Sequence, residues 1–406
     1  MCSYFWSASI VGVGVTVPPR FVGKRGGQEA EGPTANLVGD GTSRRNGTAV
    51  KRTITALIAL VLVALPAQAE TLQACVDSDD VSIPFTLTVD GQDATGRYAL
   101  PAAAPTGFVL FSHGYGHMSK SWDVHLRNAA RDLNVIAVAM DYRGTQVVDP
   151  DAEYPSTRGW RVAEGAADGI AASQHFDAAC PAMGAFVNFG VSMGGNTSGL
   201  IAAEAVKRAD GVTPMFDYWV DVEGATNVSE TYHEASAVAP VNAFAANAKA
   251  DIEQEMGGTF AERREVYLER SVVTRAGDIA ASGLKGVVLV HGLDDGLVPY
   301  NQSREMAAAL YDAGVSYDFV TISRRDAESE KDTTITGTVI GPVKGDYVSP
   351  LAGHASERST TNIVMKQALL RLSMLFSGDG PEEDCWGEYH VDGGGELGDA
   401  QKHCEF

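Results

Sequence analysis

The sequence predicts an α/β fold with a mostly parallel central sheet and helices on both of its faces. Apolar strand-like segments alternate with helical segments along much of the chain, and this alternation favours a parallel sheet. Residues 106–111, 134–140 and 286–292 are largely apolar, as expected of strands that helices cover on both faces. An alternating pattern over residues 81–100, interrupted by Asp90-Gly91, predicts a hairpin at the sheet edge.

The remaining elements follow in order. Residues 303–313 form a helical pattern that ends at Gly314, where a left-handed residue is expected. A further helical pattern, 197–209, stops at Gly211. The other predicted elements are helices within 161–178 and 360–376 and strands at 185–189, 216–222 and 317–322, with a charged loop at 323–350.

Residues 228–283 form a long insertion between two predicted strands. Apolar residues recur at helical spacing within it, so we expect an amphipathic helix. Such a helix could cover a site or only add packing. We favour a cap, because loops at the carboxyl ends of parallel strands are where ligands bind.

The N-terminal part of the chain predicts export. Lys51-Arg52 precedes an apolar core at 54–65 and the Ala67-Gln68-Ala69 cleavage pattern, so residues 50–69 indicate a signal peptide cleaved after Ala69. The core is shorter than the about 18 apolar residues of a membrane span. We therefore expect a secreted or periplasmic protein without stable membrane insertion. Residues 1–49 show no structural pattern, and we expect translation to begin near Val50.

The net charge of the chain narrows the classes of molecule that it is expected to bind. The formal net charge is −21, and the predicted leader is basic, so the mature chain is more acidic still. This charge argues against nucleic acids and anionic membranes as partners.

Four cysteines follow the predicted cleavage site, which suits two disulfides in an exported protein. Three connectivities are open. We favour Cys385 with Cys404, which would pin the acidic, Gly-rich tail at 377–406, and Cys75 with Cys180.

Three motifs carry chemistry. Gly190-Val191-Ser192-Met193-Gly194 follows an apolar strand and precedes a helix, which is the context of a nucleophile elbow. The stretch 291–299, His-Gly-Leu-Asp-Asp-Gly-Leu-Val-Pro, follows another strand, and His354 precedes the last helix. A serine hydroxyl needs an adjacent base to become a nucleophile.

With these motifs the sequence resembles the α/β-hydrolase superfamily from His113 to about residue 375, within an expected catalytic domain at 70–376. The resemblance implies a triad of Ser192, Asp295 and His354 in the family's chain order. Asp294 is the neighbouring alternative for the acid. His390 and His403 also follow Asp295, but they lie in the tail.

The resemblance also implies an oxyanion hole made by the backbone amides of Met193 and of Tyr115, which follows His113-Gly114. This chemistry needs no cofactor. His113 and His117 stand in a Gly-rich loop without a third ligand nearby, so we expect no metal site there.

The expected function is hydrolysis of carboxylic esters through an acyl-enzyme, with a small-molecule or polymeric ester as the substrate. Ser-Met-Gly-Gly at the elbow is similar to cutinases and polyester hydrolases, whereas Glu269-Arg270-Ser271 resembles the prolyl-oligopeptidase-like branch. Peptidases of that branch carry a large N-terminal propeller. Only about forty residues separate Glu70 from His113, too few for such a domain. A serine peptidase and a non-catalytic hydrolase-fold binding protein remain the alternatives.

Overall fold

The computed structural model describes residues 75–180, 183–323, 354–392 and 397–404. The predicted leader and signal peptide, and almost all of the loop at 323–350, lie outside these ranges. The strands are β1 (Ile83–Val89), β2 (Gln92–Ala99), β3 (Gly107–Ser112), β4 (Val135–Met140), β5 (Gln146–Val147), β6 (Thr157–Arg158), β7 (Ala185–Val191), β8 (Tyr218–Val222), β9 (Gly286–Gly292), β10 (Tyr317–Ile322), β11 (Cys385–Val391) and β12 (Leu397–Cys404).

The helices include two short 3-10 turns, η1 and η2. Their bounds are η1 (Ser119–Trp122), α1 (Asp123–Leu133), α2 (Val162–Ala179), α3 (Met193–Ala202), α4 (Val228–Val238), α5 (Ala243–Met256), α6 (Phe260–Arg270), η2 (Val272–Arg275), α7 (Ala276–Ser282), α8 (Asn301–Asp312) and α9 (Ile363–Ser377).

Within the described residues, ten strands form one sheet in the order β1-β2-β4-β3-β7-β8-β9-β10-β11-β12. The pairs from β4 to β11 are parallel, and β1, β2 and β12 join the two edges in antiparallel fashion. The sheet is thus mostly parallel, as the sequence predicts, and β1 and β2 form the expected edge hairpin.

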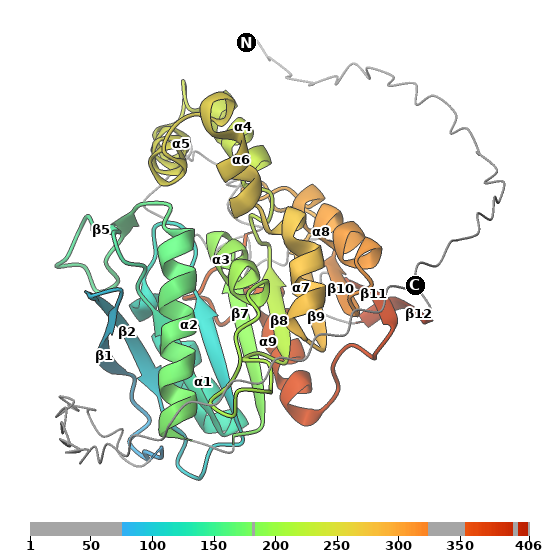
Figure 1. Ribbon diagram of the computed structural model, residues 1–406. Helices are drawn as coiled ribbons and strands as arrows, with labels where there is room; N and C mark the ends of the chain where they lie inside the picture. Colours follow the sequence, from blue (N-terminus) through green and yellow to red (C-terminus); the bar gives the residue numbers. More distant parts are fainter. Residues whose placement is uncertain (1–74, 181–182, 324–353, 393–396, 405–406) are drawn as a thin grey trace, which may run out of the picture. The chain divides into compact units, whose positions relative to one another are not determined.

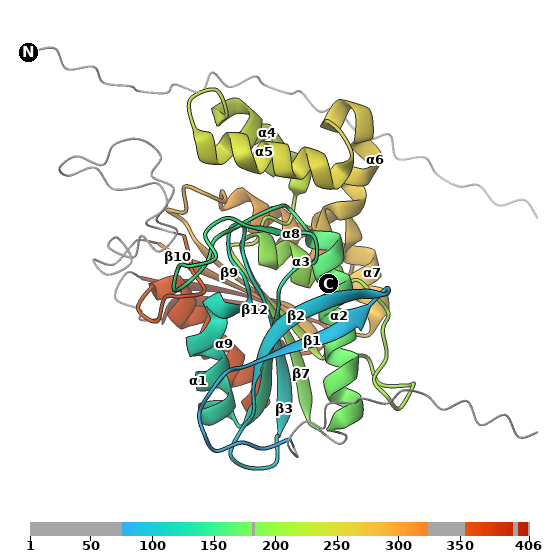
Figure 2. The ribbon, with the colours of Figure 1, turned by 90° about the vertical axis from the view of Figure 1, so that its left-hand side faces the viewer.

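Helices cover both faces of the sheet (Figures 1 and 2). Helices α1 and α9 pack on one face over a core that includes Phe111, Phe189 and Val290. Helices α2, α3, α7 and α8 pack on the other face over Phe108, Phe186 and Leu289. This arrangement is the α/β-hydrolase fold. The insertion helices α4, α5 and α6 lie beyond one end of the sheet (Figure 1).

The helix after the elbow differs from the prediction. It begins at Met193 and ends at Ala202, whereas the sequence predicts 197–209. The chain then forms a tight hairpin, because the Asp210 side chain accepts the backbone N–H groups of Val212 and Thr213 at 2.8 Å each. Gly211, with φ +71°, turns this hairpin rather than ending a helix.

The acidic tail also differs from expectation, because it adds strands to the sheet. Strand β11 pairs in parallel with β10, and β12 pairs with β11. Both favoured disulfides are confirmed: Cys75 bonds to Cys180, and Cys385 bonds to Cys404 across the β11–β12 pair. Among the described residues, no helix is long and apolar enough to cross a membrane.

Candidate active site

The nucleophile elbow has the backbone that the motif requires. Ser192 lies between β7 and α3 with φ 59° and ψ −125°, a conformation that L residues rarely adopt. A side chain at Gly190 would place its Cβ 2.0 Å from the Gly194 carbonyl oxygen, and one at Gly194 would lie 2.1 Å from the Ser112 oxygen. Only glycine fits at both positions, so the turn holds Ser192 at the carboxyl end of the sheet.

The candidate acid and base meet although they are far apart in the sequence. His354 Nδ1 lies 2.6 Å from Asp295 Oδ2. The other oxygen of Asp295 accepts the N–H groups of Leu297 at 2.8 Å and Val298 at 3.1 Å, which fixes the carboxylate. Both members of the pair are buried, whereas Asp294 is exposed. The structure therefore favours Asp295 over its neighbour as the partner of His354.

His354 and Asp295 shift each other's pKa values in opposite directions. Burial alone would lower the pKa of His354, but the negative charge and hydrogen bond of Asp295 raise that pKa to about 9. Burial would likewise raise the pKa of Asp295, but the charge of His354 holds it below its ordinary value. His354 Nε2 makes no hydrogen bond in the described part of the chain, and Ser192 lines the same cavity. The serine–histidine bond itself is not formed in this structure.

The loop after β3 runs directly beside the elbow. A Cβ on Gly114 would lie 3.2 Å from Ser192 Cβ. The Gly114 N–H donates a short hydrogen bond to Glu357 Oε1 and is therefore occupied, so the amide of Tyr115 remains the candidate oxyanion donor of this loop. The second candidate donor, the amide of Met193, opens helix α3, where the helix dipole favours negative charge.

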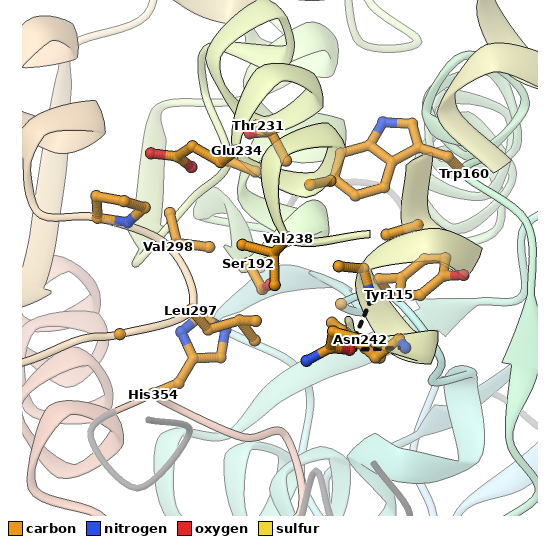
Figure 3. Close-up of a pocket in the computed structure, with 18 of the residues that line it drawn as sticks. Tyr115, Trp160, Ser192, Thr231, Glu234, Val238, Asn242, Leu297, Val298 and His354 are labelled. Atoms are coloured by element: carbon orange, nitrogen blue, oxygen red, sulfur yellow. Dashed lines mark hydrogen bonds between the residues drawn. The ribbon is translucent and has the colours of Figure 1, made fainter. Parts of the chain in front are cut away.

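Three of the candidate residues, Tyr115, Ser192 and His354, line a cavity of about 310 Å³. Ser192 lines it from the turn after β7 and His354 from the loop before α9, and Thr231, Glu234 and Val238 of α4 line it from the insertion (Figure 3). The insertion therefore forms one wall of the cavity. Helix α5 and the loop after Asp295 add six apolar residues to the lining: Phe244, Ala245, Ala248, Leu297, Val298 and Pro299.

Two buried acids near His354 escaped the sequence analysis. Glu357 is 1% exposed and forms a short ion pair with His117, which lines the cavity from the Tyr115 loop. Glu223 follows β8, is fully buried, and lies 3.3 Å from His354 Nδ1. An acid directly after a predicted parallel strand was a usable signal for Glu223, because site residues gather at strand carboxyl ends. Glu357 had no comparable signal.

The described residues contain two groups whose atoms are close enough to hold a metal. Glu223, His291 and Asp295 form one group, but His291 Nε2 faces the Val298 carbonyl at 3.0 Å and must carry a proton to donate to it. The other group includes Cys385 and Cys404, whose sulfurs form a disulfide. Neither set of donors suits a metal ion.

A family model described as the prolyl oligopeptidase family matches residues 121–331, just over half of the chain. The chain belongs to the prolyl oligopeptidase family. Membership of this family confirms the resemblance to the α/β-hydrolase superfamily seen in the sequence, and the mostly parallel sheet of the chain agrees with it. The defensin propeptide model also matches, over residues 52–86, and about half of that stretch is predicted signal peptide. No curated protein matches the chain.

Solved structures of both peptidases and esterases resemble this family member. An acylaminoacyl peptidase from Pyrococcus horikoshii is 15% identical, with a TM-score of 0.47, and the match covers 74% of this chain and 42% of the peptidase. A puromycin-hydrolysing peptidase from Mycobacterium tuberculosis is 20% identical, with a TM-score of 0.40 and coverage of 60% and 36%. An esterase from Pyrobaculum calidifontis is 18% identical, with a TM-score of 0.44 and coverage of 59% and 73%. The chain thus spans about two fifths of these peptidases' length, and likenesses this distant do not choose between the two reactions.

Proposed function

We propose that this chain hydrolyses carboxylic esters through an acyl-enzyme on Ser192. The observation that carries the proposal is the 2.6 Å contact between His354 Nδ1 and Asp295 Oδ2, which leaves His354 Nε2 available in the cavity that Ser192 lines. His354 takes the serine proton, Asp295 holds the imidazolium, and the amides of Tyr115 and Met193 bind the oxyanion. His354 then activates water for deacylation.

The cavity lining supports an ester with an aliphatic acyl group. The walls contributed by Ala235, Val238, Ala248 and Leu297 are apolar. Against these four apolar side chains, the backbone N–H and C=O groups of a peptide would find no partners, which costs about 1–3 kcal/mol for each group. An acyl chain has no such groups. Polyesters with aliphatic segments present the same chemistry and belong to the proposed substrate class.

Peptide hydrolysis is the second candidate, and the family match favours it. An amide leaving group must be protonated as it departs, which requires closer placement of His354 than an ester does. We expect p-nitrophenyl esters of short acids to be cleaved far faster than aminoacyl or prolyl p-nitroanilides. Equal or greater kcat/KM on the anilides would reject the esterase proposal in favour of a peptidase.

A fluorophosphonate probe separates both enzymes from a non-catalytic binding protein. The probe should modify Ser192, and Ser192→Ala should abolish the labelling while the protein stays folded. Turnover should fall by on the order of a millionfold in this variant. A folded wild-type protein without modification would favour the binding protein.

We also propose that the chain is exported after cleavage at Ala69. Two disulfides support this proposal, because they persist in oxidising compartments. Mass spectrometry of secreted material should find Glu70 as the first residue, and retention of residues 50–69 would contradict the proposed cleavage.

A further inference from the structure

Glu223 is an acid in a place that packing alone does not explain. It directly follows β8 and is fully buried. Its φ is +49°, a left-handed conformation that is unusual for a non-glycine residue. Local strain of this kind costs of order 1–3 kcal/mol and gathers at functional sites. Removing a carboxyl group from water adds a further cost.

The contacts of Glu223 join the two loops that carry the candidate acid and base. One oxygen accepts the N–H of Gly292 at 3.0 Å, at the end of β9 and just before the Asp295 loop. The other accepts the N–H of Ala355, the residue after His354, and lies 3.3 Å from His354 Nδ1. The backbone of Glu223 is fixed as well, because its N–H donates to the Val290 carbonyl at 2.9 Å.

The ionisable groups around Glu223 come from three elements. His291 lies near it on β9, and Asp295 lies near it on the following loop. A side-chain nitrogen or oxygen of each of the three residues lies within 4.8 Å of those of the other two. His354 faces it from the loop before α9. Burial and the charge of Asp295 raise the pKa of Glu223 well above its ordinary value, while His354 and the two N–H donors oppose this rise.

We propose that Glu223 is a positioning residue, a second carboxyl group that shares the Nδ1 proton of His354 with Asp295. This inference rests on the proposed function. When Ser192 gives its proton to His354 Nε2, the Nδ1 proton stays between Asp295 Oδ2 and Glu223 Oε2. Glu223 thereby stabilises the imidazolium and fixes the loops that carry its two partners. In this step one proton moves from the Ser192 hydroxyl to His354 Nε2, and no other bond is made or broken in the triad.

The test compares Glu223→Gln with Asp221→Asn. Asp221 is also a fully buried acid of β8, but it makes no contact with His354. Both oxygens of Glu223 accept backbone N–H groups and one of them faces His354 Nδ1, which favours the carboxylate form in spite of burial. Glu223→Gln then removes one negative charge beside the imidazole, so the acid limb of the kcat/KM profile on p-nitrophenyl butyrate should move to lower pH by about one unit or more. We expect kcat at its plateau to fall by about ten- to a hundredfold, since small misplacements of a catalytic group cost this much. Asp221→Asn should leave the acid limb in place, whatever it does to stability.

A double-mutant comparison tests the sharing of the proton. In Asp295→Asn, Glu223 is the remaining carboxyl group on Nδ1, so adding Glu223→Gln should reduce the residual rate by at least about tenfold more. Glu223→Asp keeps the charge but shortens the reach, and it should fold if Glu223→Gln does not. A lower melting temperature with an unmoved acid limb in Glu223→Gln would mean a merely structural role and overturn the proposal.

A measurement that needs no turnover separates the role of Glu223 from the proposed ester hydrolysis. The imidazole of His354 can be titrated by NMR in histidine-labelled protein, with His354→Gln used to assign its signal. Its pKa should be lower in Glu223→Gln than in the wild type. Failure of ester cleavage and of fluorophosphonate labelling would reject the proposed function, whereas an unchanged His354 titration would reject the role of Glu223.

Discussion

The Tyr115 O–H donates a hydrogen bond of 2.5 Å to Asp251 Oδ2, and this bond joins the candidate oxyanion loop to helix α5 of the insertion. Asp251 also accepts two hydrogen bonds from Arg158, at 2.8 and 2.9 Å, and one from the Gly159 N–H. The ring of Tyr115 packs edge-on against Phe244, 5.5 Å between centroids, at the start of the same helix. The position of helix α5 and the position of the Tyr115 loop are therefore linked.

Tyr115→Phe should remove the hydrogen bond to Asp251 while keeping the aromatic ring. A hydrogen bond to a charged group contributes about 1.5–3 kcal/mol to stability. We expect a loss of this size in urea unfolding and a lower kcat/KM on p-nitrophenyl esters. Tyr232→Phe is the matched control, because Tyr232 donates to Glu253 of the same helix at 2.7 Å but does not line the cavity. Equal kinetic effects of the two variants would contradict a link to the site.

Asp295→Asn should be severe, because an amide would favour the wrong tautomer of His354. We expect kcat to fall by about ten-thousandfold, as in other triads. Asp294→Asn should be mild, since this neighbouring side chain is exposed. Stopped-flow or steady-state assays of both variants decide the matter, and the reverse order of effects would move the acid by one residue.

Glu357 should make stability depend on pH in the acid range. Burial opposes its ionisation, but His117 and the Gly114 N–H lower the pKa of Glu357 to about 2. A carboxyl group with a depressed pKa stabilises the fold above its ordinary value near 4.5, and this stabilisation, about 3 kcal/mol, is lost as the pH falls toward 2. Glu357→Gln should flatten this part of the curve in urea unfolding at pH 7 and pH 3. Glu265→Gln, at an exposed position, should not, and identical curves for wild type and Glu357→Gln would refute the assignment.

The two disulfides should contribute unequally to stability. Cys75–Cys180 closes a loop with a sequence separation of 105, against 19 for Cys385–Cys404. Chain entropy then makes removal of the first pair, by double Cys→Ala substitution, about 1.5 kcal/mol more costly than removal of the second. Denaturant unfolding of the two double variants measures the difference. A larger loss for Cys385–Cys404 would show that native contacts of the β11–β12 edge outweigh loop length.

The sequence predicted most of the sheet because its strands are locally distinctive. Apolar runs such as 134–140, the Asp90-Gly91 turn and the glycines around Ser192 each impose a conformation through nearest neighbours alone. The same reasoning failed after Ala202, where helical periodicity continued but the side chain of Asp210 and Gly211 favoured a hairpin. It also missed β11 and β12, because acidic residues and glycines in short edge strands weaken the alternation on which strand prediction depends.

By itself, then, the sequence determined the order of the elements, the elbow at Ser192 and the candidates Asp295 and His354. Only the tertiary structure decided what surrounds them. Glu223 contacts His354, and Glu357 contacts His117. These contacts form where strand ends and loops that are far apart in the chain converge. The physical reason is that burial and charge at a site are set by neighbours in space, and no spacing along the chain encodes the removal of a carboxyl group from water.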